Sequence, residues 1–161
     1  MRNCRVVLGI LIAGWLLTGL ASAQTAEDKK MAAYIDMMKK DVRAQKQSLV
    51  DQAMGLEAAQ KSQFWSIYDG YQTALNAIWD QRIANIKKYA DNFDKMTDGT
   101  ADQLAVTMLD IEGQRTALKK KYYATYKEKM GARVAARFLQ VETMLGSLID
   151  LKLGSEIPIL Q

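Results

Sequence analysis

Apolar residues recur at three- and four-residue spacing along most of the chain, which is the period of an amphipathic α-helix. The first such stretch runs from Glu27 to Met54 and is followed by Gly55, which we expect to end the helix. Its apolar positions are Met31, Tyr34, Ile35, Met38, Val42, Leu49 and Val50. The pattern predicts a helix of about 28 residues.

The clearest pattern lies between about Glu57 and Met96. A helix of about 40 residues would be roughly 60 Å long, which is too long to be covered by one small core. Its apolar positions are Phe64, Ile67, Tyr68, Tyr71, Leu75, Ile78, Trp79, Ile83, Ile86, Tyr89, Phe93 and Met96.

A turn is predicted at Thr97-Asp98-Gly99, and a third helix is predicted to begin directly after it. Thr100-Ala101-Asp102-Gln103 has the capping-box form, in which the hydroxyl and the amide each satisfy a backbone N–H of the first turn. The helix should continue for about 30 residues to Met130. Gly131 is expected either to break it or to bend it.

A fourth helix is predicted from Ala132 to about Leu151, followed by Gly154 and Pro158, which should end regular structure. Its apolar positions are Val134, Phe138, Val141, Leu145, Leu148 and Ile149. The apolar residues 157–160 are expected to dock back onto a helix, and no stretch has the alternating pattern of a strand.

The fold class predicted is therefore all-α, with four unequal helices and a long central helical hairpin. Closed up-and-down bundles favour helices of matched length, because each apolar stripe must be covered along its whole run. Helices of about 28, 40, 30 and 20 residues do not match. We expect an elongated arrangement that forms an open homodimer rather than a closed bundle.

Residues 1–23 have the three parts of a cleavable signal peptide: basic Arg2 and Arg5, an apolar run, and the cleavage site Ala21-Ser22-Ala23. The run from Val6 to Leu20 is shorter than the roughly 20 residues that cross a bilayer, so a retained anchor is the weaker interpretation. The prediction is a periplasmic protein whose single helical domain is residues 24–161, with no stable membrane insertion after cleavage.

Composition argues against catalysis and against nucleic-acid binding. The chain has no histidine, and its one cysteine, Cys4, lies within the predicted signal peptide. The commonest general base and the soft metal ligands are therefore missing, and we expect neither an enzyme nor a bound cofactor or metal. The formal net charge of +4 falls by two when Arg2 and Arg5 are removed, which leaves too little charge to favour nucleic acid.

A basic block stands out in this nearly neutral chain between Arg115 and Arg137. A solvated helix face is the simpler interpretation, and electrostatic capture of an anionic client, partner or lipid headgroup is the functional one. The residues predicted to steer such a ligand are Arg115, Lys119, Lys120, Arg133 and Arg137.

Candidate apolar contacts come from side chains that do not fit the main helical stripes. Trp65 adjoins Phe64 rather than following it by three or four residues, and Met37 and Met38 are neighbours that cannot both face one core. Methionine adapts to partners of varied shape, although it also fills gaps between helices. We therefore predict Met37, Met38 and Trp65 as apolar contact residues.

Two segments resemble the L-T-x-x-Q motif of the Spy/CpxP-like periplasmic helical proteins. Leu56-Glu57-Ala58-Ala59-Gln60 has Glu57 where that motif has Thr, and Thr100-Ala101-Asp102-Gln103 follows Gly99 where the motif has Leu. The resemblance implies long helices in hooked hairpins that dimerise into a thin cradle, and a role as an ATP-independent chaperone or stress-response adaptor. It does not extend to the zinc-binding relatives, which are rich in histidine.

These observations favour a chaperone-like binder of unfolded or stress-exposed envelope proteins, acting through apolar and basic helical surfaces. The alternative is a dedicated envelope adaptor with one specific partner, such as a sensor-domain inhibitor or a scaffold.

Overall fold

The computed structural model describes residues 46–159. The predicted signal peptide and the predicted helix from Glu27 up to residue 45 lie outside the described residues. The described part contains α2 (Ala58–Asn92), the short 3-10 helix η1 (Phe93–Lys95), α3 (Asp98–Met130) and α4 (Ala132–Glu156). Residues 46–54 are also helical, and residues 46–159 contain no strand, which confirms the all-α fold class.

Two of the predicted helix boundaries are confirmed closely. The helical residues 46–54 end at Gly55, which has φ 52° and whose N–H donates to the Asp51 carbonyl at 3.2 Å. The long helix begins at Ala58, within a residue of the prediction, but ends at Asn92 rather than Met96. The residues that were predicted as its last turn form η1 instead.

The predicted start of the third helix is wrong by one turn. Thr97, not Thr100, is the N-cap of α3: its backbone is extended, and its hydroxyl accepts a hydrogen bond from the Thr100 N–H at 3.2 Å. Asp98 and Gly99 therefore belong to the first helical turn rather than to a loop. A threonine cap followed by Asp98 satisfies an amide and places a carboxylate at the positive end of the helix dipole.

Gly131 breaks the helix rather than bending it, and α4 begins at the next residue. Its φ of 89° lies in the left-handed half of backbone space, which residues with a Cβ rarely enter. The predicted end of the fourth helix is wrong, because Gly154 lies within α4 and the helix continues to Glu156. It stops where Ile157 becomes extended before Pro158, since the residue before a proline disfavours the helical conformation.

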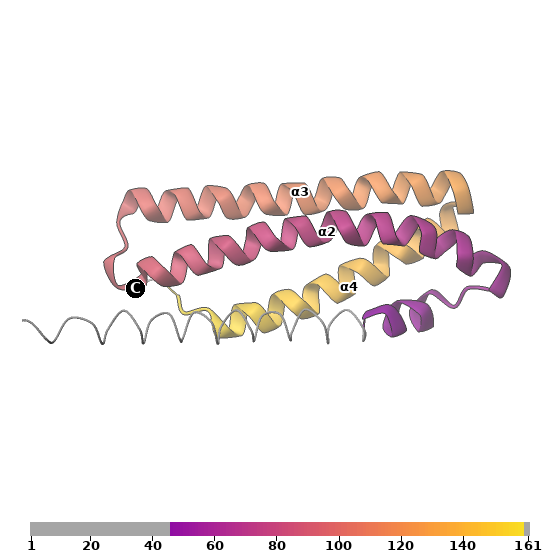
Figure 1. Ribbon diagram of the computed structural model, residues 1–161, viewed down its shortest axis with the longest axis horizontal. Helices are drawn as coiled ribbons and strands as arrows, with labels where there is room; N and C mark the ends of the chain where they lie inside the picture. Colours follow the sequence, from indigo (N-terminus) through magenta and orange to yellow (C-terminus); the bar gives the residue numbers. More distant parts are fainter. Residues whose placement is uncertain (1–45, 160–161) are drawn as a thin grey trace, which may run out of the picture. The chain divides into compact units, whose positions relative to one another are not determined.

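Helices α2 and α3 form an antiparallel hairpin, and the chain reverses again at Gly131 so that α4 runs back along the hairpin (Figure 1). Close packing joins α3 to both α2 and α4, whereas α2 and α4 meet through large side chains such as Tyr71 and Phe138. The end of α4 returns to the hairpin, where the Tyr89 hydroxyl donates to the Pro158 carbonyl at 2.6 Å. The predicted docking of residues 157–160 is therefore partial, because Ile159 is 87 % exposed and Leu160 lies outside the described residues.

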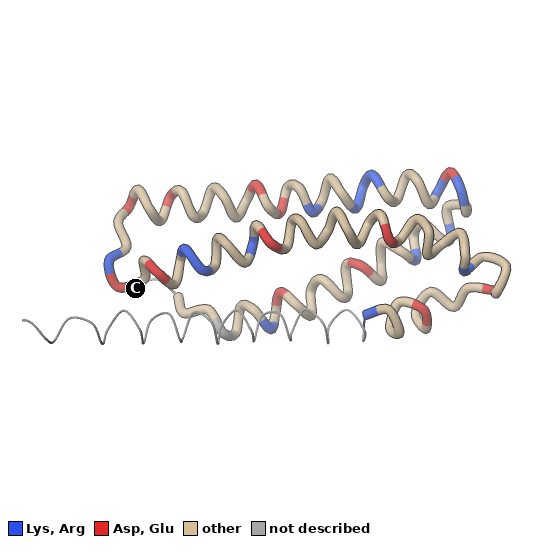
Figure 2. Tube along the Cα trace, viewed as in Figure 1, with Lys and Arg blue, Asp and Glu red and all other residues tan. Residues whose placement is uncertain are grey.

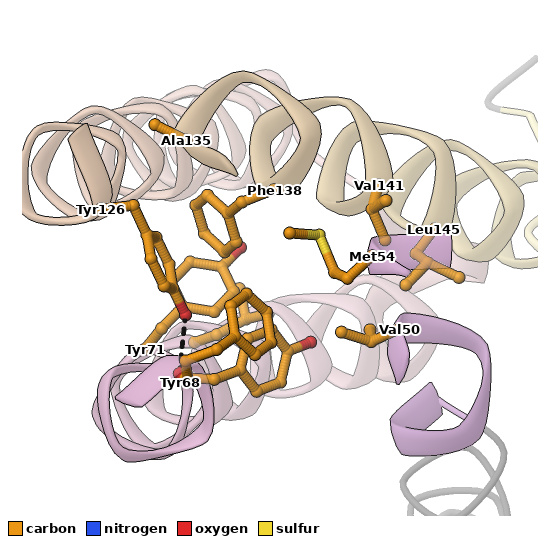
Figure 3. Packing of buried hydrophobic residues seen from close by; sticks show 11 residues of the cluster. Val50, Met54, Tyr68, Tyr71, Tyr126, Ala135, Phe138, Val141 and Leu145 are labelled. Carbon is orange, nitrogen blue, oxygen red and sulfur yellow. Dashed lines mark hydrogen bonds between the residues drawn. The ribbon is translucent and has the colours of Figure 1, made fainter. Parts of the chain in front are cut away.

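Aromatic rings fill the space where the three helices meet (Figure 3). Phe138 of α4 packs with ring centroids 5.0 Å from Tyr71 of α2 and 4.5 Å from Tyr126 of α3. The Tyr126 hydroxyl, buried beside them, donates to the Phe64 carbonyl at 3.2 Å. The buried cluster consists of Val50, Met54, Phe64, Tyr68, Tyr71, Leu75, Tyr126, Ala135, Phe138, Val141 and Leu145.

Within residues 46–159, no helix contains a stretch that is both long and apolar enough to cross a bilayer.

Replacing glycine by alanine should have opposite effects on stability at Gly131 and at Gly113. An added Cβ meets nothing within 4 Å at either position, but Gly131 has φ 89° whereas Gly113 lies inside α3. We expect Gly131→Ala to lower the free energy of unfolding by about 1–3 kcal/mol through backbone strain. Gly113→Ala should raise it by about 0.5–1 kcal/mol. Urea unfolding of both variants measures this, and a neutral Gly131→Ala would contradict it.

Candidate functional site

The five basic residues predicted to bind a ligand differ in their exposure to solvent. Lys120, Arg133 and Arg137 are exposed, Lys119 is half-buried, and Arg115 is buried. Figure 2 shows Lys and Arg gathered where α3 ends and α4 begins. A basic surface therefore exists at this junction, but it does not include all the residues that the sequence pattern placed in it.

Arg115, predicted as a steering residue, is turned inward and buried, so its charge does not face solvent. Its Nη1 donates to Glu112 Oε1 at 2.8 Å and to Asp150 Oδ2 at 3.2 Å, and its guanidinium lies 5.3 Å from the Trp79 ring centroid. The side chain reaches α4 at Gly146, where an added Cβ would lie 2.9 Å from Arg115 Nη2. Helix α3 thus uses this arginine to hold α4.

A second arginine completes this ion cluster, which we define as Arg82, Glu112, Arg115 and Asp150. Arg82 Nη1 pairs with Asp150 and lies 3.7 Å from Glu112 Oε1. Trp79 packs under both guanidinium groups, with the Arg82 group 5.0 Å from its ring centroid. Since the members come from α2, α3 and α4, the cluster ties all three helices together.

The predicted apolar contact residues are not brought together in the described part of the chain. Trp65 is half-buried and meets Phe64 and Tyr68 edge to face at centroid distances of 5.3 and 5.2 Å, so it packs against the buried core. Met37 and Met38 lie outside the described residues.

One exposed face of α4 carries both positive and apolar side chains. Arg133, Arg137, Met144, Leu148 and Leu151 follow one another at spacings of four, seven, four and three residues, which places them along one side of a helix. The exposed fractions of Met144, Leu148 and Leu151 are 53, 58 and 73 %. We call these five residues the α4 outer face.

The apolar half of this face was not recognised as a surface from the sequence. The helical pattern places Leu148 with the core residues of the fourth helix, but Leu148 faces solvent while Val141 and Leu145 are buried. The available signal was the pair Met144 and Leu145, two large apolar neighbours that cannot both point into one core. Helix α4 thus has an inner and an outer apolar stripe.

A second polar cluster is buried beside the aromatic core and includes Lys46 and Glu142, neither of which was predicted. Glu142 accepts hydrogen bonds from the Tyr68 hydroxyl at 2.6 Å and the Tyr71 hydroxyl at 2.9 Å, and Lys46 Nζ donates to it at 3.1 Å. Lys46 also donates to Gln72 at 3.0 Å. The carboxylate is thereby satisfied by donors from α2 and from the helical residues 46–54.

Burial dominates the protonation of this cluster. Burial lowers the pKa of Lys46, and the charge and hydrogen bond of Glu142 only partly oppose it. Burial and then the Glu142 charge raise the pKa values of the Tyr68 and Tyr71 hydroxyls, which remain protonated donors. Within the described residues, no group of three or more acidic, His or Cys side chains is arranged to hold a metal ion.

The chain finds no match among protein-family models, curated proteins or solved structures. The choice of site therefore depends on the geometry of residues 46–159. Lys46, Glu142 and the two arginines of the ion cluster are buried and paired with groups on other helices. The α4 outer face offers apolar area and the Arg133 charge to solvent, while Arg137, also exposed, donates from Nη1 to the Met54 carbonyl at 2.7 Å. We take the α4 outer face as the candidate functional site.

The buried pair of Lys46 and Glu142 should be far more sensitive to substitution than the exposed pair of Lys61 and Asp51. Glu142→Gln leaves a buried ammonium without its counter-charge, and we expect it to lower the free energy of unfolding by about 3–5 kcal/mol. Adding Lys46→Met should recover part of this loss. In the control pair both side chains are about 40 % exposed, so Asp51→Asn should cost at most about 1 kcal/mol. If Glu142→Gln and Asp51→Asn lowered the free energy of unfolding equally, the buried pair of Lys46 and Glu142 would not have the role assigned to it.

The buried tyrosines predict loss of stability at alkaline pH. The pKa values of Tyr68, Tyr71 and Tyr126 are raised above the ordinary 10.0, so above this pH the unfolded chain releases protons that the folded protein keeps. Stability must then fall as pH rises, by up to about 1.4 kcal/mol per pH unit for each group. The pKa of Lys46 is lowered in the folded protein, so this group makes stability rise with pH. Its contribution ends near pH 10.5, the ordinary lysine pKa, where the unfolded chain also loses the proton.

Urea unfolding between pH 8 and pH 12 measures how steeply the free energy of unfolding falls with pH. Tyr68→Phe with Tyr71→Phe should reduce it, while Tyr123→Phe, outside the groups bonded to Glu142, should not. A slope above pH 10 that is unchanged in the double variant would refute the role given to the two hydroxyls.

Proposed function

We propose that this protein is a periplasmic, ATP-independent chaperone-like binder that captures exposed segments of unfolded envelope proteins on the α4 outer face. The observation that carries the proposal is the alignment of exposed Met144, Leu148 and Leu151 with Arg133 and Arg137 on one side of a helix. The expected signal peptide supports the compartment, and the resemblance to Spy/CpxP-like proteins supports the kind of activity.

The apolar half of the face suits weak and reversible capture. Covering a large apolar side chain is worth about 1.5–3 kcal/mol, and association costs an opposing several kcal/mol in lost freedom. Three side chains such as Met144, Leu148 and Leu151 therefore give modest affinity, which permits release without ATP. Methionine and leucine side chains on a helix surface also adapt to clients of different shape.

The basic half of the face suits recruitment. Arg133 and Arg137 are exposed near the start of α4, close in the sequence to exposed Lys127 and Lys129 at the end of α3. Clustered charges of one sign raise the rate at which oppositely charged partners arrive, and salt weakens this effect. Client segments that combine acidic and apolar residues match both halves of the face. A homodimer would double the number of such faces.

The apolar half is tested by the triple variant Met144→Ser, Leu148→Ser, Leu151→Ser. Val106→Ser with Leu109→Ser provides the matched control, because these residues are 49 and 71 % exposed on α3, away from the α4 outer face. The measurement is suppression of aggregation of several unrelated unfolded clients. We expect the triple variant to require at least tenfold more protein for equal suppression, since a tenfold change corresponds to only about 1.4 kcal/mol of binding. The control should match the unchanged protein.

The basic half is tested in the same assay with Arg133→Gln and Arg137→Gln. This variant should act more weakly at low salt and lose most of its salt dependence. Equal activity of the triple serine variant and the unchanged protein would refute the proposed face. Inactivity toward every client, together with stoichiometric capture of one envelope protein, would favour the dedicated adaptor instead.

A further inference from the structure

A small pocket of about 20 Å³ lies between α2, α3 and α4, and Lys46 of the helical residues 46–54 also lines it. A cavity of ~10–15 Å³ is enough for one water molecule, so this pocket has room for one water or one monatomic ion. Trp79 and Leu145 form part of its apolar wall. The polar groups of the wall decide which of these occupants it prefers.

Positive charge predominates on the wall of this pocket. Among the described residues that line it, Lys46, Arg115 and Lys119 are cationic and Glu142 is the one carboxylate. Lys46 and Arg115 are each 8 % exposed, and Lys119 is half-buried. Glu142 balances Lys46, and the ion cluster that contains Arg115 is neutral, with two arginines and two carboxylates. Lys119 therefore leaves one positive charge, which a single monovalent anion would balance.

The Lys46 ammonium has a hydrogen-bond donor to spare. Its Nζ carries three N–H groups, and two of them are used, on Gln72 Oε1 at 3.0 Å and Glu142 Oε2 at 3.1 Å. The third is free to donate to an occupant of the pocket that Lys46 lines.

Arg115 also presents a donor to the pocket. Its hydrogen bonds to Glu112 and Asp150 all leave from Nη1. Gly146 lines the pocket, and an added Cβ there would lie 2.9 Å from Arg115 Nη2, which places Nη2 at the wall. Nη2 is not sealed off, because in residues 46–159 the one side-chain N or O that is both fully buried and without a partner is Arg82 Nε.

The carboxylate on the wall is already occupied. Glu142 accepts hydrogen bonds from Tyr68, Tyr71 and Lys46, so the pocket offers donors more than acceptors. A water molecule brings two donors of its own and gains less from such a wall than an ion that only accepts. A cation would be repelled by the two buried positive groups, Lys46 and Arg115.

We propose that this pocket binds one chloride ion, which accepts hydrogen bonds from Lys46 Nζ and Arg115 Nη2, while Lys119 supplies the balancing charge. Burial is the main cause that lowers the pKa of Lys46, and repulsion by Arg115 adds to it. An anion between the two cations reduces this repulsion and so stabilises the packing of the helices that carry them. The site is separate from the α4 outer face and does not depend on the proposed chaperone activity.

Urea unfolding at constant pH and constant ionic strength tests the proposal, with sodium chloride replacing sodium gluconate, whose anion is too large for the pocket. An ion that binds only the folded protein stabilises it by mass action. For a Kd of about 10 mM, about 100 mM chloride should raise the ratio of folded to unfolded protein about tenfold, and the gain per added chloride should fall off above the Kd as the site fills. No gain in chloride would overturn the proposal and indicate that water fills the pocket.

Variants test the location. Lys119→Gln removes the balancing charge, and Gly146→Ala places a Cβ against Arg115 Nη2, so each should reduce the gain to about twofold, as expected for a tenfold weaker site. Lys121→Gln removes the same charge from an exposed position on α3, and Gly113→Ala adds the same methyl group in open space. Both controls should keep the full gain.

The gain is measured within each variant, so changes in stability that do not depend on chloride cancel. Circular dichroism establishes that each variant is folded. A full gain in both folded Lys119→Gln and folded Gly146→Ala would overturn the location.

Discussion

Phe138 is the contact on which the arrangement of residues 46–159 depends, because its ring packs against both helices of the hairpin at once. Tyr71 of α2 and Tyr126 of α3 are buried against it, and Met54 and Val50 from the helical residues 46–54 extend the same cluster (Figure 3). This contact sets the rotation of α4 about its own axis. Phe138, Val141 and Leu145 face inward, and Met144, the direct neighbour of Leu145, faces solvent.

Two polar clusters fix the position of α4 along its own axis. Glu142 lies one turn after Phe138 and meets the hydroxyls of Tyr68 and Tyr71, while Asp150, two turns further along α4, meets Arg82 and Arg115. A shift of α4 by one turn would separate both carboxylates from their partners. Buried charges are costly when unpaired, so such a shift would be strongly disfavoured even though the apolar contacts could re-form.

Helix α4 also keeps large apolar side chains on its surface. Helix α4 has more large apolar residues than one side can bury, and the excess forms the outer face that we propose as a client site. Near the end of the hairpin that contains η1, a pocket lined by Ile86, Tyr89, Leu104 and Met108 lies between α2 and α3.

Local chemistry was sufficient to predict the helices themselves. The period of Phe64, Tyr68 and Tyr71 indicates the buried side of α2, and Gly55 and Gly131 end helices because they accept positive φ. Tertiary structure alone decided which of Met144 and Leu145 is buried, and whether Arg115 points to solvent or to Asp150. The reason is distance along the chain: a helical period depends on neighbours within one or two turns, whereas burial of Arg115 depends on a carboxylate that lies 35 residues away.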